Sequence, residues 1–401
     1  MESAIVKEAP AANIGLHPSE NLSTLVKMTV TEITARTILR RYKRIDSWFI
    51  SSMGMNLYRG CTHGCRYCDG QAEQYRLTGE FGKDVEVKTN ALDLLNKELN
   101  AKRRIPIPGG FVCVGGGVTD TFQPMNEKYA LARGALELLL KKRKPVHLLT
   151  KSHHVLEHID LIKQLQTTSA ATVSFSFSCV DESVARVLEP GAPSPSKRLE
   201  AMKRIKAAGI FCGMFLMPVI PGVSDTEAQL TASLKAAKTV GVDYVVFGTL
   251  TLKPGRQHDR FLELVEENWP QHVAGYRKIF TGNRWGAPIM GYQEKIHRRL
   301  APIADELDIP LRIPDTVFGS TVDDTEKVII ILEHLDYLSM MAGRASHFGL
   351  AAHSVVQSKT NIHELLPKLA SMRGFGSFTI DIVHEILETG TAHQYRKLLH
   401  L

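Results

Sequence analysis

Three cysteines within one short segment form the densest group of reactive side chains in this 401-residue sequence. Cys61, Cys65 and Cys68 lie in the segment NLYRGCTHGCRYCD, so their spacing is C-x3-C-x2-C. Cysteine thiolates are the usual ligands of iron–sulfur clusters, and glycines at 60 and 64 let the backbone turn sharply around an inorganic core. The spacing therefore predicts that one loop holds three corners of a 4Fe–4S cubane. The fourth iron is left open, and an open iron binds a substrate or cosubstrate.

Structural zinc and a disulfide framework are the competing interpretations of these cysteines. Zinc usually takes four ligands in two separated pairs, and the other cysteines, Cys113, Cys179 and Cys212, occur singly. His63 offers a fourth ligand only from a position wedged between Cys61 and Cys65. Disulfide frameworks are typical of small secreted chains with cysteines throughout. The pattern favours the iron–sulfur cluster.

Short apolar runs alternate with amphipathic segments around and after the cysteines. Runs rich in β-branched or aromatic residues, bounded by Gly, Pro or polar residues, are typical of buried parallel strands; they occur at 110–114, 146–150, 171–177, 210–219 and 244–250. Helical patterns lie between them at 89–99, 127–141, 155–166, 195–208 and 226–239. Strand–helix alternation predicts βαβ units. With one strand expected before the cysteines there are about six repeats, so we predict an α/β fold with a partial, open (β/α)6 barrel.

Several polar features follow directly after the predicted strands. They are the cysteine loop, the run of Gly115, Gly116 and Gly117, then Lys151, Ser176 to Ser178, and Pro218. Because active sites of parallel sheets gather at the carboxyl ends of the strands, these features are expected to meet at one rim.

The chain divides into four expected regions. The expected regions are a flexible N-terminal tail at 1–30, the barrel core at 31–255, a mixed α/β extension at 256–320, and a helical domain at 321–401 with a helix-hairpin-helix-like segment at 366–398. The second of these regions is expected to begin with a helix at residues 31–45, which has Ile33, Ile38 and Leu39 on one side and basic residues on the other.

The cysteine spacing, with an aromatic residue before the last cysteine, resembles the signature of the radical S-adenosylmethionine (SAM) superfamily. From about 35 to 255 the chain also resembles the spore photoproduct lyase and DNA-repair-photolyase-like family, through the segments NLYRGCTHGCRYCD, GGGVTDTFQP, LLTKSHHV, VSFSFS, LEPGAPSPSKRLEAMKRIKAAGI and PVIPGVSD. The resemblance implies that the open iron chelates the amino and carboxylate groups of SAM. An electron donor such as flavodoxin or ferredoxin then reduces the cluster, and SAM yields a 5′-deoxyadenosyl radical that abstracts hydrogen from the substrate.

The resemblance also implies residues for the SAM pocket. Tyr67 contacts the adenine, and Thr119, Lys151 and Ser176 hold the methionine end. The chemistry is compatible, because an ammonium pairs with a carboxylate and the glycine run at 115–117 lets backbone come close to a ligand.

The sequence departs from true photoproduct lyases at the hydrogen donor. Their donor cysteine corresponds to Gly117 here. Cys113 lies four residues earlier on the same strand face, about 13 Å deeper at ~3.3 Å per residue, so a core role is expected and a donor role is the minor alternative. His153 and His154 can be interpreted as metal ligands or proton shuttles. Adjacent side chains at a helix start point apart, so joint ligation is not expected; a helix-start role is favoured and a catalytic role is the alternative. Glu189 and Arg198 can form a salt bridge or touch substrate, and both interpretations stay open.

The C-terminal segment has the rhythm of a DNA-binding hairpin. An apolar helix, the G-h-G turn of Gly374 and Gly376, and a second apolar helix resemble a helix-hairpin-helix module, which binds nucleic-acid backbones without sequence preference. Amides at the start of the second helix can take a phosphate, and Arg373 adds charge. An ordinary helical hairpin is the alternative, favoured by Asp381, Glu385 and Glu388 on the second helix.

Net charge and hydropathy limit which partners and which cellular location are expected. The net charge of +7 favours polyanions. No stretch approaches the roughly 18–20 apolar residues of a membrane span, and residues 1–15 lack the apolar region of a signal peptide, so a cytoplasmic protein is expected. We predict a lyase-like radical SAM enzyme acting on nucleic acid, in repair or modification. A radical enzyme for a small molecule or peptide is one alternative, and it predicts C-terminal helices packed against the barrel mouth. A non-enzymatic cluster-bearing DNA-binding or redox-sensing protein, without a SAM pocket, is the other.

Overall fold

The computed structural model describes residues 29–75, 77–101 and 109–399. The predicted N-terminal tail therefore lies outside the described residues except for its last two positions, which begin a strand. Among the described residues, no helix is long and apolar enough to cross a bilayer.

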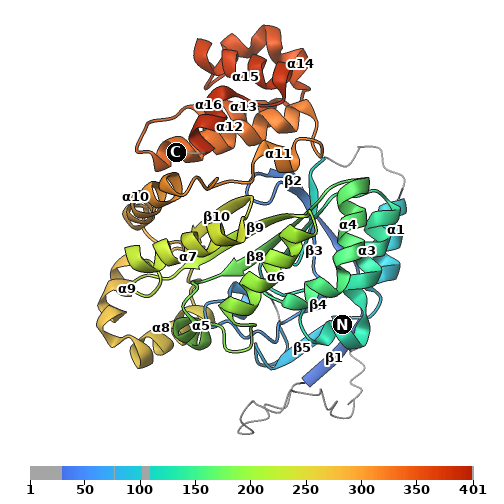
Figure 1. The fold of residues 1–401 in the computed structure, drawn as a ribbon, viewed down its shortest axis with the longest axis vertical. Coiled ribbons are helices and arrows are strands. Elements are labelled where there is room, and N and C mark those ends of the chain that lie inside the picture. Colours follow the sequence, from blue (N-terminus) through green and yellow to red (C-terminus); the bar gives the residue numbers. More distant parts are fainter. Residues whose placement is uncertain (1–28, 76, 102–108, 400–401) are drawn as a thin grey trace.

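A curled seven-stranded sheet forms the centre of the fold (Figure 1). Its order is β10-β9-β8-β7-β6-β3-β2. The strands are β2 (Leu39–Asp46), β3 (Ser51–Met55), β6 (Phe111–Val114), β7 (Val146–Thr150), β8 (Ala171–Phe177), β9 (Phe211–Val219) and β10 (Tyr244–Thr249). All pairs from β3 to β10 are parallel and β2 is antiparallel to β3. Six parallel strands in an open sheet confirm the predicted partial (β/α)6 barrel.

Helices cover the outer face of the sheet, as the βαβ pattern predicts. They are α1 (Ala91–Asn100), α3 (Leu131–Lys141), α4 (Ile159–Thr168), α5 (Glu182–Leu188), α6 (Pro195–Ala207) and α7 (Glu227–Val240). The expected helix at 127–141 is interrupted: α2 (Met125–Tyr129) ends at Ala130, whose φ of 50° breaks the helix before α3 begins.

The helix expected at 31–45 is wrong. This stretch forms β1 (Thr29–Ile33) and β2. Leu39 and Ile45 are buried, while Arg40, Arg41, Lys43 and Arg44 are exposed along the sheet edge. Basic side chains on an edge strand discourage further strand pairing, and the pairing of β2 with β3 overrides the helical periodicity. A second sheet, β1-β5-β4, adds β4 (Tyr58–Arg59) and β5 (Asp84–Lys88).

The chain after β10 is helical. The helices are α8 (Arg256–Asn268), α9 (Val273–Ile279), α10 (Met290–Glu306), α11 (Asp315–Phe318), α12 (Asp324–Met341), α13 (Phe348–Ser358), α14 (Ile362–Leu365), α15 (Ser377–Thr389) and α16 (His393–Leu399). Residues 256–320, all of them described, contain no strand, so the mixed α/β extension is corrected to a helical one.

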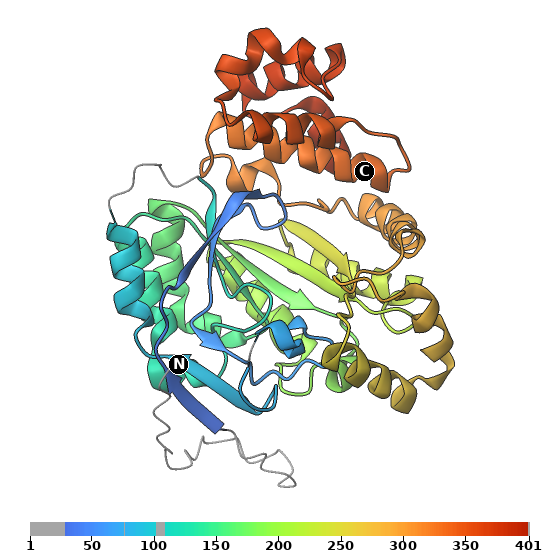
Figure 2. The ribbon, with the colours of Figure 1, turned by 180° about the vertical axis from the view of Figure 1, so that it is seen from behind.

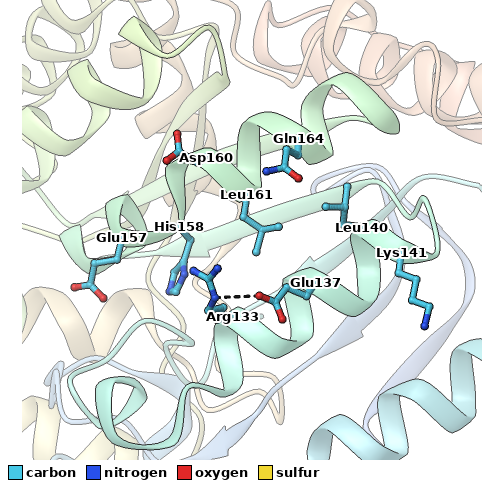
Figure 3. A pocket seen from close by; sticks show the side chains of 9 residues that line it. All are labelled: Arg133, Glu137, Leu140, Lys141, Glu157, His158, Asp160, Leu161 and Gln164. Carbon is cyan, nitrogen blue, oxygen red and sulfur yellow. Dashed lines mark ion pairs between the residues drawn. The ribbon is translucent and has the colours of Figure 1, made fainter.

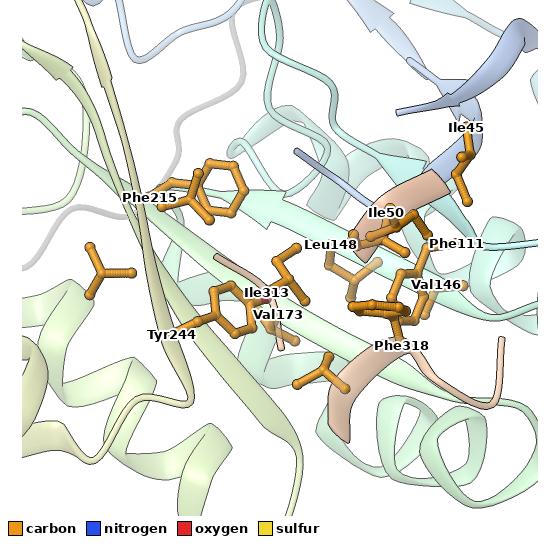
Figure 4. Close-up of a cluster of buried hydrophobic side chains, with 14 of the residues drawn as sticks. Ile45, Ile50, Phe111, Val146, Leu148, Val173, Phe215, Tyr244, Ile313 and Phe318 are labelled. Carbon is orange, nitrogen blue, oxygen red and sulfur yellow. The ribbon is translucent and has the colours of Figure 1, made fainter. Parts of the chain in front are cut away.

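The C-terminal helices close the amino end of the sheet. Gly110, just before β6, donates its N–H to Thr321 O at 2.6 Å, and His334 of α12 hydrogen-bonds Ser47 O at 2.8 Å. Ile313 and Phe318 pack among the first residues of β6 and β7 (Figure 4). Figure 2 shows helices α12 to α16 at the top, at the other end of the molecule from β1 and β5. The helices therefore lie opposite the barrel mouth, contrary to the arrangement that the small-molecule alternative predicts.

Two buried histidines and one half-buried histidine are expected to make the protein acid-sensitive. Burial lowers the pKa of His147 to about 4, of His297 to about 4 and of His334 to about 3. Between pH 6.5 and 4 the unfolded chain takes up protons that the folded chain does not, so the unfolding free energy falls with pH by ~1.4 kcal/mol per unit for each histidine. Urea unfolding at about pH 7 and about pH 5 measures this loss. His334→Gln should reduce the pH dependence, and an unchanged dependence would count against this origin.

Candidate active site at the carboxyl ends of the strands

The cysteine loop follows β4 and is folded tightly. Gly64 donates its N–H to Cys61 O at 3.3 Å, and Cys68 donates its N–H to Cys65 O at 3.1 Å. Gly60 has a φ of 80°, and a Cβ there would lie 2.5 Å from Asp84 O, so this turn requires glycine. The thiols of Cys61 and Cys65 are buried and that of Cys68 is half-buried. One short loop therefore presents all three sulfur atoms within the protein.

The cysteine loop fits a cubane better than a tetrahedral zinc ion. The loop supplies three thiols, whereas a structural zinc site takes four ligands, usually in two separated pairs. Burial raises the pKa of Cys65 to about 12 and that of Cys68 to about 11, so free thiolates are unfavourable here without a bound cation. Gly70 donates its N–H to Cys68 Sγ at 3.3 Å, the kind of contact that stabilises a cluster thiolate.

Lys151 and Ser176 meet beside the aromatic residue of the cysteine loop. Lys151 follows β7, and its Nζ donates to Ser176 Oγ in β8 at 2.6 Å. The same Nζ lies 5.7 Å from the ring centroid of Tyr67. Ser176 in turn donates to Met217 O of β9 at 3.2 Å. Residues from three neighbouring strands and the loop thus converge, as the carboxyl-end argument predicts.

The glycine run and Thr119 adjoin the same loop. Thr119 donates its hydroxyl to Gly60 O at 2.7 Å. At Gly115, with a φ of 87°, a Cβ would lie 2.6 Å from Leu149 O, whereas nothing lies within 4 Å of the Cβ positions of Gly116 and Gly117. The second and third glycines therefore border open space, where backbone can approach a ligand closely.

Asp120 is a buried residue of this site that the sequence reasoning did not select. Its carboxylate accepts from Thr150 Oγ1 at 2.8 Å and from the N–H of Lys151 at 2.7 Å. It also lies 3.6 Å from His63 Nδ1, so His63 turns this ring nitrogen toward a carboxylate. Its position directly after Thr119, in the loop that follows β6, is the signal that could have found Asp120.

Glu189 and Arg198 form a buried ion pair within the site. Glu189 and Arg198 are 3% and 1% exposed, and Glu189 also accepts from the hydroxyl of Tyr67. Burial alone would raise the pKa of Glu189, but the charges of Arg198 and Lys151 outweigh it and hold the pKa at about 2. The carboxylate is therefore ionised, and the salt bridge that the sequence left open exists.

Other candidate residues lie outside this group. Cys113 is buried within β6, where burial raises its pKa to about 12. The rings of His153 and His154 lie 4.5 Å apart instead of pointing away from each other, and Ser152 caps the 3₁₀ turn that they begin. Arg373, Gly374 and Gly376 lie in the turn that precedes α15, in the C-terminal region beyond the opposite end of the sheet.

Cavity size alone does not locate this site. A hollow of about 430 Å³ lies on the outside, between α3 and α4, and none of the predicted residues lines it (Figure 3). A smaller one of about 140 Å³ touches Asn56, Gly60, Gly70 and Thr119, beside the cysteine loop. The convergence of thiols, ammonium and glycines, rather than volume, defines the site.

Comparisons with known proteins agree with this geometry. The family model of the radical SAM superfamily matches residues 55–234. An uncharacterized protein of Mycobacterium tuberculosis is 32% identical over 256 residues, covering 62% of this chain and 72% of the relative. A radical SAM Nalpha-GlyT isomerase of Pseudomonas phage M6 is 23% identical, covering 62% of this chain and 50% of that protein. A structure of spore photoproduct lyase complexed with dinucleoside spore photoproduct has a TM-score of 0.53 at 16% identity, covering 73% and 85% of the two chains.

A partial α/β barrel with a three-cysteine loop at its mouth defines an enzyme that uses a 4Fe–4S cluster and SAM. The chain belongs to the radical SAM superfamily and shares its fold with spore photoproduct lyase.

Proposed function

We propose that this radical SAM enzyme acts on nucleic acid, in a repair or base-modification reaction. Cys61, Cys65 and Cys68 hold the cluster, with Tyr67 at the adenine of SAM. When bound and reduced by a flavodoxin- or ferredoxin-like donor, the cluster and SAM supply a 5′-deoxyadenosyl radical for hydrogen abstraction.

The chain's own side chains bind and orient the cosubstrate. Lys151 pairs its ammonium with the SAM carboxylate, and Ser176 fixes the direction of that ammonium through their 2.6 Å contact. Thr119 lies beside the cysteine loop at the methionine end. Gly115, Gly116 and Gly117 let backbone approach the ligand. Burial of the loop excludes water from the reactive centre.

The C-terminal hairpin is the observation that supports nucleic acid as the substrate class. Gly374 has a φ of 88°, and a Cβ there would lie 2.3 Å from the N atom of Ala351, so the turn requires glycine. The helix α15 begins after Gly376 with no side-chain cap and no acidic residue in its first turn. Its first amides are thus available to a phosphate, with exposed Arg373 nearby.

One structural neighbour supports the same substrate class. Spore photoproduct lyase has been solved with a dinucleoside bound, and this chain shares its fold. The hairpin lies beyond the end of the sheet opposite the cysteine loop, so it would anchor the backbone of a long polymer rather than present the reacting base. Gly117 replaces the hydrogen-donating cysteine of photoproduct lyases, which favours a reaction other than thymine-dimer repair.

The test of this function is anaerobic 5′-deoxyadenosine release by the reduced enzyme. Intact DNA, UV-damaged DNA, RNA and a small-molecule extract are supplied separately. Nucleic acid should increase the release and acquire a mass change. Stimulation by the nucleic-acid-free extract alone would contradict the proposal and favour the small-molecule or peptide alternative.

Arg373→Ala is expected to weaken DNA binding at all sequences alike. Loss of one phosphate contact should reduce the slope of log affinity against log salt by about 0.9 for duplex DNA. Fluorescence anisotropy with a labelled duplex at several salt concentrations measures both quantities. Arg143→Ala, which removes another exposed arginine, is the matched control. Equal slopes for Arg373→Ala and the wild type would argue against a phosphate contact at the hairpin.

A further inference from the structure

Glu189 has no role in the pocket proposed above, yet it lies against two residues of that pocket, Tyr67 and Lys151. One carboxylate oxygen, Oε2, accepts from Arg198 Nη2, and the other, Oε1, accepts from the hydroxyl of Tyr67. Lys151 Nζ lies 3.8 Å from Oε1, which is within ion-pair range but too long for a hydrogen bond. Both oxygens of Glu189 are therefore engaged by residues other than Lys151.

Arg198 holds the carboxylate from the side of the sheet. Its Nη1 donates to Ser176 O at 2.7 Å and its Nε donates to Pro193 O at 2.9 Å. The guanidinium also lies 4.8 Å from the ring centroid of Phe177. A guanidinium with three fixed contacts cannot follow a ligand, so it places Glu189 relative to the strand that carries Ser176.

The backbone around Glu189 is joined to the cysteine loop. Arg66 donates its N–H to Leu188 O at 2.8 Å, and Gly191 donates its N–H to His63 O at 3.0 Å. A Cβ at Gly191 would lie 2.3 Å from Thr62 O, so the two segments approach closely. The residues before and after Glu189 thus bond directly to the loop that carries the cysteines.

We propose that Glu189 is a positioning residue that aligns Tyr67 and Lys151 for SAM, and that Arg198 keeps its carboxylate from capturing the lysine. The inference rests on the proposed SAM contacts of Lys151 and Tyr67. With Arg198 on one oxygen and Tyr67 on the other, Lys151 keeps Ser176 as its hydrogen-bond partner and offers its remaining N–H groups to the SAM carboxylate. Glu189 attracts the ammonium toward the tyrosine ring without binding it.

The anionic form of Glu189 is needed for this arrangement. A glutamine could accept from Tyr67, but it would leave Arg198 as an unpaired buried cation and remove the attraction on Lys151. The alternative is that Glu189 and Arg198 only neutralise each other's buried charge and do not align the pocket. The experiment must therefore separate alignment of the pocket from charge compensation.

The test compares Glu189→Gln with the double variant E189Q/R198M, which removes both charges. Anaerobic calorimetry gives the dissociation constant of SAM, and electron paramagnetic resonance follows the change in the reduced-cluster signal on SAM addition. Glu189→Gln should retain its iron and bind SAM at least about tenfold more weakly, the effect of losing a residue that orients a ligand-binding group. E189Q/R198M should regain thermal stability without regaining SAM affinity or the spectral change. Recovery of all three by the double variant would overturn the proposal, because Glu189 would then only neutralise Arg198.

Three further variants keep the result interpretable. Tyr67→Phe preserves the ion pair but frees Oε1, so Lys151 is expected to turn to Glu189 and SAM affinity to fall; unchanged affinity would contradict the alignment role even if Glu189→Gln does not fold. Asp243→Asn, which removes a Lys206 ion pair elsewhere, should leave SAM affinity unchanged. Lys151→Met, measured in parallel, distinguishes a failure of the proposed SAM pocket from a failure of the role proposed for Glu189. If it too leaves affinity unchanged, the proposed pocket fails, whereas a loss with Lys151→Met but not with Glu189→Gln removes only the role of Glu189.

Discussion

Cys65→Ala is expected to remove the iron of the purified protein and to lower 5′-deoxyadenosine release by at least about a hundredfold, beyond the 10- to 100-fold cost of losing a residue that merely supports a ligand. Cys65 is the middle cysteine of the loop, and its thiol is buried. The charges of Lys151 and Glu189 both act on this thiol. Two remaining thiolates leave a cubane with two unprotected irons. Iron content, visible absorption and anaerobic product analysis measure the loss.

Cys113→Ala is the matched control for that experiment. Cys113 is also buried, but it lies inside β6, in register with Gly54 of β3 and His147 of β7, away from the loop. The control should retain iron and release 5′-deoxyadenosine. A Cys65→Ala protein that still released 5′-deoxyadenosine, or a wild-type protein holding a single zinc ion, would refute the assignment of the loop.

The strands of the barrel could be predicted because burial on both faces leaves a strong signal. The runs at 146–150 and 171–177 coincide with β7 and β8, whose residues are nearly all buried. The N-terminal strands could not be predicted in the same way. The β2 strand lies at the sheet edge with most of its basic side chains in solvent, and its apolar residues happen to fit helical spacing. Only its pairing with β3 distinguishes the two structures, and pairing is not visible in a local pattern.

The residues of the site also divide into those that a local sequence pattern predicts and those that it does not. The cysteine spacing is local, so it could be predicted, and the residues after each strand followed from the rule for carboxyl ends. Glu189 could be noticed but not interpreted, because its partner Tyr67 is 122 positions away and its charge is set by Lys151 and Arg198. Asp120 was missed because a single aspartate after a turn resembles a solvent-exposed one until the buried N–H of Lys151 is found beside it.

Lys151→Met is expected to weaken SAM binding about 10- to 100-fold while leaving the cluster intact, since a hydrogen bond to a charged group contributes about 1.5–3 kcal/mol and each 1.4 kcal/mol is tenfold in affinity. Methionine keeps most of the buried stem, so the packing against Tyr67 is largely retained while the ammonium is removed. Lys206→Met, which breaks the 2.7 Å pair with Asp243, is the matched loss of a lysine ion pair away from the mouth and should leave the SAM dissociation constant unchanged. Anaerobic calorimetry on protein of equal iron content measures this dissociation constant. Equal SAM affinity for the wild type and Lys151→Met would place the SAM carboxylate elsewhere and leave Ser176 without its proposed function. A selective loss would instead locate the cosubstrate between β7, β8 and the cysteine loop, where the Lys151 ammonium lies 5.7 Å from the centroid of the Tyr67 ring.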